Sequence, residues 1–538
     1  MTLQLRWLRG DEAARRAVER WREGSLPGEV LRQNERRRLV RLRDPEAGEL
    51  LVKHFRLGTG RHRLREAWKA RLGRSGPDRE HRALAHLAAR GVAVPAPRGL
   101  AELPDGDRLL VLEFVAGVPL AEVLARPRPE RSRALAALGR EVAGLHAAGL
   151  VHGDLHGENL LFAARGPVIL DLQHARRRRG EAGRARDLGE LDYSLWRRAS
   201  LADRVRVRAA ALGLARPFDP AARRTLRRVG DAAARRAHQH GRSRTRRSLQ
   251  PGRLYAALAL GGARGLRVRD VPAETVAAAL AGHAEALAAG DARVLTDDGR
   301  SRITDVRAGA QRVVVKQVLP RGPARALADT FRGSSARRAW RAGHGLLARG
   351  IGAARPLAFL ERRRAGIPVG SWLVLEHTDP ALDALAAAAR DPDATLEALR
   401  RLVDALHRRA VVHGDLKASH VFLDLRESPP RAQLIDLESV RFCRRLSSAR
   451  RLADLAELNA SLPDAVPAAP RRLAFDRYRA VHRFAEGRAA ALRTLVRLSL
   501  ARRHRWTGRG CACAESGEAG AGRARGGGGA GVSDSARR

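Results

Sequence analysis

The chain contains almost no lysine. Its 538 residues include 103 Lys and Arg, but only four of these are lysines: Lys53, Lys69, Lys316 and Lys417. The other 99 are arginines, and the formal net charge is +45. GC-rich codon bias explains a general replacement of lysine by arginine wherever either is tolerated. The remaining lysines are therefore candidates for positions at which a compact ammonium group matters chemically; Lys69 is instead interpreted as a solvated helix residue.

Aromatic residues are also scarce, at 4% of the chain. Proteins that bind single-stranded nucleic acids stack the bases on aromatic side chains. The arginines are spread along the whole chain, and the chain lacks such aromatic platforms. We therefore expect no specific nucleic-acid partner. The diffuse positive charge favours a general attraction to anionic surfaces, such as a membrane.

Cysteines and long apolar runs are few. Cys443, Cys511 and Cys513 cannot form a disulfide framework, which indicates a reducing compartment. The apolar stretch 254–266 carries Arg264 and is shorter than the about 18 residues that a membrane span needs. No basic segment followed by an apolar run opens the sequence, so we expect no signal peptide. These absences predict a cytoplasmic protein.

A long-period duplication is present. The segment VHGDLHGENLLF at 151–162 matches VHGDLKASHVFL at 412–423, and three further features recur in the same order. The displacements lie between 261 and 267 residues for the pairs Lys53/Lys316, Asp154/Asp415, Asp171/Asp436 and Asp187/Asp454. The sequence therefore predicts two homologous units, 1–235 and 236–500, followed by a Gly/Arg-rich tail, 501–538, that we expect to be disordered.

Each unit has the same predicted order of elements. Two strands joined by a turn come first, then a helix that ends at a glycine, then a further strand, and the remainder is mostly helical. The predicted strands and helices are 37–42, 49–55, 79–92 and 108–115 in the first unit, and 292–306, 312–318, 337–351 and 371–378 in the second. The predicted fold class is α+β, with a small β-rich lobe and a larger helical lobe in each unit.

The HGD segment of the first unit resembles the catalytic and metal-binding loops of the protein-kinase-like fold. That resemblance implies Asp154 as the catalytic base and Asn159 and Asp171 as Mg²⁺ ligands. It also assigns three residues to ATP binding. Lys53 would hold the phosphates, Glu80 would pair with Lys53, and Glu113 lies at the end of the strand 108–115. Each feature is weak alone, but their order and spacing in two copies are specific.

The second unit departs from this pattern at two positions. The resemblance implies Asp415 as its catalytic residue, Lys316 for ATP, and Asp436 and His420 for the metal. Ala339 occupies the position of Glu80, so Lys316 lacks the expected helix partner, and His420 replaces Asn159. Imidazole is a poorer Mg²⁺ ligand than an amide oxygen. We therefore expect the first unit to be the better catalyst and the second to be a kinase of different specificity or a substrate-positioning pseudokinase.

The sequence as a whole resembles the lipopolysaccharide kinase (Kdo/WaaP) family of the protein-kinase-like superfamily, in tandem duplicate. The resemblance rests on REHRALAHLAARGVAVPAP at 79–97, VHGDLHGENLLF at 151–162, VILDLQHAR at 168–176 and RARDLGEL at 184–191. DLQ and DLE stand where protein kinases have Asp-Phe-Gly. No G-x-G-x-x-G precedes the sheet lysine of either unit, so RQNERRR at 32–38 is the expected phosphate-covering turn.

This resemblance implies an ATP- and Mg²⁺-dependent kinase that phosphorylates a heptose or Kdo hydroxyl of the lipopolysaccharide inner core. The expected partners are this glycan or a related anionic glycan, and an anionic membrane surface. The expected location is the cytoplasm, peripheral to the inner face of the cytoplasmic membrane. Two alternatives remain open: a small-molecule or Ser/Thr kinase of the same fold, and a non-catalytic basic scaffold with degenerate kinase lobes.

Overall fold

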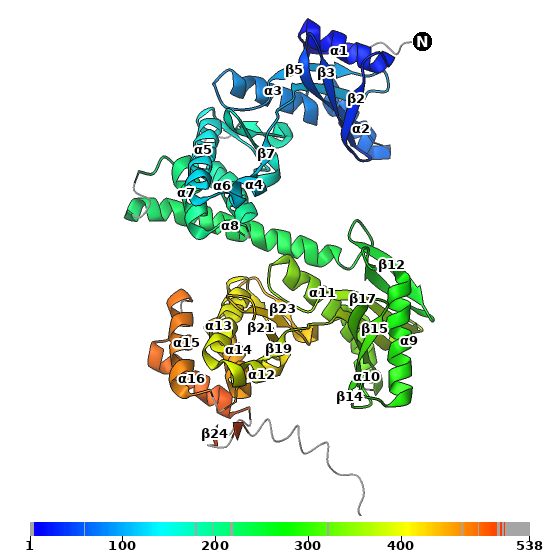
Figure 1. Ribbon diagram of the computed structural model, residues 1–538, viewed down its shortest axis with the longest axis vertical. Helices are drawn as coiled ribbons and strands as arrows, with labels where there is room; N and C mark the ends of the chain where they lie inside the picture. The colour runs from blue at the N-terminus through cyan, green and yellow to red at the C-terminus, as the bar shows by residue number, and fades with distance from the viewer. Residues whose placement is uncertain are drawn as a thin grey trace, which may run out of the picture. The chain divides into compact units, whose positions relative to one another are not determined.

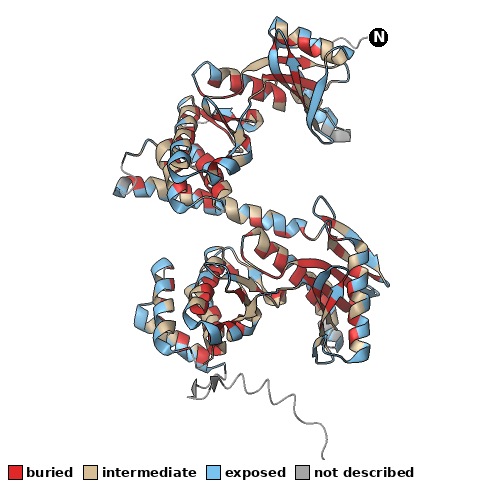
Figure 2. Ribbon diagram, viewed as in Figure 1, coloured by how far each residue is buried: buried red, intermediate tan, exposed pale blue. Residues whose placement is uncertain are grey.

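The computed structural model describes residues 5–58, 60–177, 180–196, 198–215, 219–319, 322–463, 466–482, 484–502, 506–507 and 510–511. The chain divides into two compact units, unit 1 (Met1–His238) and unit 2 (Gln239–Arg538). Each unit has a sheet lobe and a helical lobe (Figure 1). Buried residues gather between each sheet and its helices (Figure 2). No helix among these residues is long and apolar enough to cross a membrane.

The sheet lobe of unit 1 is a six-stranded antiparallel sheet with strand order β1-β5-β6-β4-β3-β2. Its elements are β1 (Arg6–Gly10), α1 (Glu12–Glu23), β2 (Gly28–Gln33), β3 (Arg37–Asp44), β4 (Gly48–Phe55), α2 (Gly60–Arg71), α3 (Gly76–Ala88), β5 (Pro97–Glu102) and β6 (Arg108–Glu113).

Alternation along β4 directs the lysine of unit 1 away from the outer core. Leu50 and Val52 join the cluster beneath α1, with Ala14, Ala17 and Val18. Because successive residues of a strand face opposite sides of the sheet, Leu51 and Lys53 face the other side. That side is covered by α3, whose Glu80 is fully buried.

The helical lobe of unit 1 packs its core against α3 and one face of the sheet, through residues such as Leu84, Leu110 and Leu145. Its elements are β7 (Val118–Pro119), α4 (Leu120–Ala125), α5 (Arg128–Ala147), β8 (Leu150–Val151), η1 (Gly157–Asn159), β9 (Leu160–Ala163), β10 (Gly166–Ile169), η2 (Leu172–His174), β11 (Arg176–Arg177), α6 (Glu181–Leu195) and α7 (Leu201–Ala211); α8 (Pro220–Arg247) contains the division between the units.

The sheet lobe of unit 2 has seven antiparallel strands in the order β12-β13-β17-β18-β16-β15-β14. Its elements are β12 (Tyr255–Leu260), β13 (Ala263–Val268), α9 (Ala273–Ala289), β14 (Val294–Asp297), β15 (Ser301–Ala308), β16 (Gln311–Val318), α10 (Gly322–Arg332), α11 (Ser335–Ala348), β17 (Pro356–Arg364) and β18 (Ile367–Glu376).

The helical lobe of unit 2 repeats the order seen in unit 1. Its elements are β19 (Leu382–Asp383), α12 (Ala384–Arg390), α13 (Pro392–Arg408), β20 (Val411–Val412), η3 (Ala418–His420), β21 (Val421–Asp424), β22 (Arg431–Leu434), η4 (Leu437–Ser439), β23 (Arg441–Phe442), α14 (Ser448–Ser461), α15 (Ala468–Val481) and α16 (Arg488–Leu500). Most of the tail predicted for 501–538 lies outside the described residues; within it, β24 (Trp506–Thr507) pairs with β25 (Gly510–Cys511).

The predicted α+β class and tandem kinase-like lobes are confirmed, and the elements predicted around both lysines are present. One stretch has a structure that was not predicted. Segment 254–266, set aside above as too short for a membrane span, forms most of the β12–β13 hairpin. Its turn is Gly261-Gly262, and both glycines have positive φ, at 53° and 76°. A Gly-Gly pair between apolar runs is a hairpin signal, and it was overlooked.

Candidate functional site

The HGD segment of unit 1 is held by a buried carboxylate on α6. Asp187 accepts hydrogen bonds from the backbone N–H groups of His152 and Gly153, at 2.6 and 3.0 Å. His152 is itself buried, and its Nε2 lies 2.9 Å from the carbonyl oxygen of Leu170. Gly153 has φ +81°, and a Cβ there would come within 2.6 Å of the carbonyl oxygen of His174. The sequence HGD thus forms a rigid loop that presents the next side chain.

That side chain is Asp154, which is accessible. Its side chain is 37% exposed, and its Oδ2 lies 3.6 Å from Nε2 of His156. His156 holds the pKa of Asp154 below its usual value, against the effect of burial, and Asp154 in turn raises the pKa of His156. Asp154 is therefore ionised at neutral pH, which is the state that a proton acceptor requires.

Asn159 and Asp171 lie next to this loop, in positions suited to a cation. Asn159 donates from Nδ2 to the carbonyl oxygen of Asp154 at 2.9 Å, so its amide oxygen is the atom that a metal would use. Asp171 adopts the left-handed conformation, with φ 56°, directly before η2. Its Oδ1 is buried without a hydrogen-bond partner. An unpartnered buried carboxylate oxygen is costly, and a bound cation would satisfy it.

Lys53 and Glu80 form a buried ion pair in unit 1. The Nζ of Lys53 lies 2.6 Å from Oε1 of Glu80, and the two side chains are 8% and 0% exposed. Glu113 lies at the end of β6 instead, where its Oε2 accepts from the backbone N–H of Ala96 at 3.2 Å and lies 3.4 Å from Arg165. Glu113 thus contacts Ala96 and Arg165, and its assignment to ATP stays a prediction.

The expected phosphate-covering turn joins β2 to β3. The Oδ1 of Asn34 accepts from the backbone N–H groups of Arg36 and Arg37, at 2.9 and 2.8 Å, and closes the turn. Arg37 is the first residue of β3. It contacts the segment 171–173, which we call the metal loop of unit 1; its equivalent in unit 2 is 436–438. The Nη1 of Arg37 lies 3.4 Å from Oδ2 of Asp171, and its Nη2 donates to Oε1 of Gln173 at 2.6 Å. The turn is thereby linked to the loop that carries Asp171.

Unit 2 builds its HGD segment in the same way. Asp454 on α14 accepts from the backbone N–H of His413 at 3.3 Å and lies 3.2 Å from Nε2 of the buried His407. The Nε2 of His413 lies 3.2 Å from the carbonyl oxygen of Ile435. Asp415 follows, and its Oδ1 lies 3.2 Å from Nζ of Lys417. The second copy therefore retains the loop geometry although its neighbouring residues differ.

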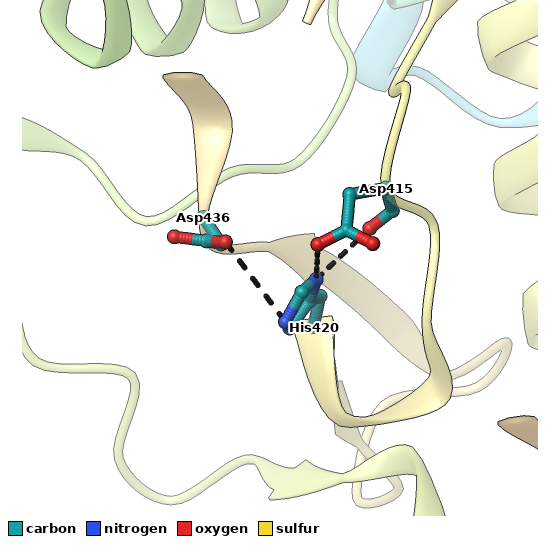
Figure 3. Close-up of side chains that lie close together, drawn as sticks. All are labelled: Asp415, His420 and Asp436. Atoms are coloured by element: carbon teal, nitrogen blue, oxygen red, sulfur yellow. Dashed lines mark hydrogen bonds and ion pairs between the residues drawn. The ribbon is translucent and has the colours of Figure 1, made fainter. Parts of the chain in front are cut away.

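His420 takes over the hydrogen bond that Asn159 makes in unit 1. Its Nδ1 lies 2.9 Å from the carbonyl oxygen of Asp415. At this distance a protonated Nδ1 donates a hydrogen bond to that oxygen. Its Nε2 lies 4.0 Å from Oδ2 of Asp436 (Figure 3). One ligand atom each from Asp415, His420 and Asp436 lies within 4.8 Å of the others. A neutral imidazole whose Nδ1 is bound in this way offers Nε2 to a cation.

Lys316 has different partners from Lys53. Its Nζ forms ion pairs with Asp436 and, at 3.0 Å, with Oε1 of Glu438. Burial alone would lower the pKa of Lys316, but the carboxylates of Glu438 and Asp436 outweigh burial and raise it. Lys316 therefore has an ion pair although Ala339 removes the helix partner, because Glu438 in the metal loop supplies another carboxylate.

Sequence reasoning overlooked three contributions to these sites. Asp187 and Asp454 were recognised only as repeat markers, although RARDLGEL and LADLAEL place them on helices after the metal loop. The contact of Arg37 with Asp171 and Gln173 depends on strand register, which no local sequence pattern shows. Glu438 was seen as part of DLE, and its contact with Lys316 needed the fold. The Nε2 of the buried His146 also lies 3.2 Å from Oδ2 of Asp187.

Comparison with known proteins places the chain among kinases. The model of the lipopolysaccharide kinase (Kdo/WaaP) family matches residues 19–210 and 324–476, one segment in each unit and more than half of the chain. Among solved structures, WaaP in complex with acyl carrier protein is 23% identical, covering 40% of this chain and 91% of that one with a TM-score of 0.30. The kinase domain of Mycobacterium tuberculosis PknI is 16% identical, covering 36% and 76%, with a TM-score of 0.24.

Curated relatives match shorter segments. The KEOPS complex subunit Bud32 of Pyrococcus abyssi is 35% identical over 85 residues, which is 16% of this chain and 37% of that protein. A probable bifunctional tRNA threonylcarbamoyladenosine biosynthesis protein of Methanosarcina mazei is 30% identical over 146 residues, 27% and 24% of the two chains. The chain thus spans well under half the length of these relatives.

Proposed function

Because the chain belongs to the lipopolysaccharide kinase (Kdo/WaaP) family, we propose that it transfers the γ-phosphate of ATP to a heptose or Kdo hydroxyl of the lipopolysaccharide inner core. Family membership supports phosphotransferase activity in general, and the acceptor is the inferred part. The observation that carries the proposal is the arrangement in unit 1, where the buried Lys53–Glu80 pair and the accessible Asp154 belong to one lobed domain.

In this proposal, Asp154 accepts the proton of the acceptor hydroxyl. The hydroxyl oxygen forms a bond to the γ-phosphorus, the bond to the ADP oxygen breaks, and ADP leaves. His156 keeps Asp154 ionised for this step, while the hydrogen bonds from His152 and Gly153 to Asp187 fix the loop. Lys53, held by Glu80, positions the phosphates of ATP.

The residues next to Asp154 fit a divalent cation, which this family of reactions implies. Asp171 has a buried oxygen without a partner, and the amide nitrogen of Asn159 is bonded to the carbonyl oxygen of Asp154, which leaves its amide oxygen for a cation. Both are hard oxygen donors of the kind that Mg²⁺ prefers. When bound, the cation would neutralise charge on the phosphates. In unit 2, Asp436, His420 and Asp415 would hold a cation.

The acceptor would be anionic and membrane-anchored, and the charge of the chain suits it. The net charge of +45 draws the protein toward anionic lipid headgroups, so we place the enzyme in the cytoplasm, peripheral to the inner face of the cytoplasmic membrane. A second candidate is a Ser/Thr or small-molecule kinase of the same fold; the segment similar to Bud32 keeps an alternative kinase-like role open. A non-catalytic scaffold would not need the Lys53–Glu80 pair.

The test is transfer of labelled γ-phosphate from ATP to purified inner-core acceptors that differ in heptose and Kdo, with mass spectrometry of the product. We expect one sugar hydroxyl to be phosphorylated by the wild-type chain. Labelling of a protein substrate in place of any sugar would favour the second candidate. Absence of transfer to every acceptor, with the chain folded, would favour the scaffold.

A further inference from the structure

Helices α2 and α10 (Figure 1) hold equivalent places in the element order of their units, and each exposes a large apolar pair. Leu64 and Trp68 are 73% and 64% exposed, and Leu327 and Phe331 are 54% and 85% exposed. In both units the pair lies 11 and 15 residues after the sheet lysine. Trp68 and Phe331 are the only exposed aromatic side chains among residues whose burial the structure describes. Exposure at one register in both copies indicates a shared use.

Each pair forms the outer face of its helix. Residues four apart in a helix lie on one face, and residues two apart are separated by about 200°. The carboxylate two residues before each aromatic residue therefore lies on the opposite face. There Glu66 pairs with Lys69 at 2.7 Å, and Asp329 pairs with Arg338 at 2.7 Å. Negative charge is thus turned away from the apolar pair and neutralised in both helices.

The surroundings of both pairs are basic. The segment 60–74 contains six Arg or Lys residues and one Glu, and 322–338 contains four Arg residues and one Asp. Apolar and aromatic side chains flanked by cations are typical of helices that lie in the headgroup region of a membrane. A second copy of this chain would bring positive charge against positive charge, which disfavours self-association through these faces.

We propose that α2 and α10 are matching membrane-contact helices, which insert Leu64 and Trp68, and Leu327 and Phe331, into an anionic lipid bilayer. The inference deepens the proposed function, because it names the surface that brings the enzyme to a membrane-anchored acceptor. It stands on exposure, register and charge, so binding can be measured without ATP or acceptor. A failure of catalysis and a failure of membrane binding are therefore distinguishable.

The first measurement is flotation of the full chain with vesicles of phosphatidylcholine and phosphatidylglycerol, and with vesicles of phosphatidylcholine alone. We expect binding to the anionic vesicles, weakened by salt. Leu64→Ser with Trp68→Ser should lower the bound-to-free ratio about tenfold, as should Leu327→Ser with Phe331→Ser. The matched control is Leu201→Ser with Leu295→Ser, two leucines that are 67% and 56% exposed elsewhere in the two units. The control should bind as the wild type does.

The second measurement is quenching of tryptophan fluorescence by brominated lipid. A quenched component should be present in the wild type and absent in Trp68→Phe, which retains an apolar ring and should still bind the vesicles. Three results would overturn the proposal: no binding to anionic vesicles, equal binding by the serine variants and the wild type, or a wild-type oligomer that the serine variants convert to monomer. The last result would identify the faces as contacts between copies.

Discussion

The two units hold the sheet lysine with carboxylates from different places. In unit 1, Lys53 pairs with Glu80 on α3, and the metal-loop Asp171 has Arg37 as its cation. In unit 2, Lys316 contacts both Asp436 and Glu438 of the metal loop. By strand register Ser301 occupies the place of Arg37, and Glu438 occupies the place of Gln173. In unit 1 the carboxylates of Glu80 and Asp171 thus have separate cations, whereas in unit 2 one lysine pairs with two carboxylates of the metal loop.

A duplicated site can therefore diverge without losing its charge balance. A carboxylate on a helix holds the lysine independently of the metal loop. Glu438, two residues after the metal-loop aspartate Asp436, holds the lysine from the loop itself. The position of Lys316 therefore depends on whether that loop holds a cation. In unit 2, a cation at Asp436 would compete with Lys316 for the same carboxylate. We therefore expect unit 1 to be the constitutive catalyst and unit 2 to be more sensitive to its cation.

Among changes to the contacts compared above, the largest expected effect comes from replacing the lysines. Lys53→Arg keeps the charge, but the bulkier planar guanidinium does not fit the buried contact with Glu80. We expect a loss of about 100-fold in kcat/KM, because displacement of phosphate-positioning groups by about 1 Å has effects of that size. Lys316→Arg should cost less than tenfold. Steady-state phosphotransfer measures both, and the reverse order would make unit 2 the main catalyst.

The second effect concerns the carboxylate that pairs with the sheet lysine, which lies on a helix in unit 1 and in the metal loop in unit 2. Glu80→Ala should lower nucleotide affinity of unit 1 by about tenfold, because Lys53 loses the partner that pre-organises it. Adding Gln173→Glu should restore part of that affinity, since it recreates the arrangement of unit 2. Fluorescent-nucleotide titration, in a chain whose Lys316 is replaced by Met, isolates the unit 1 site.

The converse exchange provides the control. In a chain with Lys53→Met, Glu438→Gln should weaken nucleotide binding to unit 2, and the added Ala339→Glu should recover it. Recovery in neither unit would mean that the two carboxylate positions are not equivalent.

The third effect is a change of metal preference. Nitrogen ligands favour Mn²⁺ over Mg²⁺ more than oxygen ligands do. Asn159→His should raise the ratio of Mn²⁺-supported to Mg²⁺-supported activity several-fold, by analogy with His420. Titration of each cation at fixed ATP measures the ratio, and Asn159→Asp, which keeps an oxygen ligand, is the control. An unchanged ratio would remove Asn159 from the metal ligands.

The smallest expected effect is on stability in acid. Burial beside Trp340 and Tyr255 lowers the pKa of His344 in unit 2 to about 3. Below pH 6.5 the unfolded chain binds a proton there that the folded chain does not, so stability falls as the pH falls from about 6.5 toward 3. Counting back from the helix-ending glycine, unit 1 has Ala85 at this place.

His344→Leu should therefore reduce the loss of stability between pH 7.5 and 5.5 by about 1 kcal/mol. Thermal unfolding at the two pH values measures this, and Ala85→Ser is the matched substitution at the equivalent place in unit 1. A pH dependence as steep as that of the wild type would contradict the assignment.

Order and spacing predicted most of the fold. The apolar strands around Lys53 and Lys316, the glycine-ended helices and the repeated HGD segments follow local patterns of period and turn residues. The contacts that distinguish the units do not follow such patterns. Arg37 reaches Gln173 across 136 residues of sequence, and Lys316 reaches Glu438 across 122. Such pairings depend on strand register and lobe packing, which single-sequence periodicity does not contain.

The claim that unit 1 carries the phosphotransfer is tested most directly by one comparison. Wild type, Asp154→Asn and Asp415→Asn are assayed side by side for transfer of labelled γ-phosphate to the inner-core acceptor. We predict that Asp154→Asn lowers the rate about 1,000-fold, because the proton acceptor is lost, and that Asp415→Asn retains most of it. Full activity of Asp154→Asn, or inactivation by Asp415→Asn alone, would contradict the account.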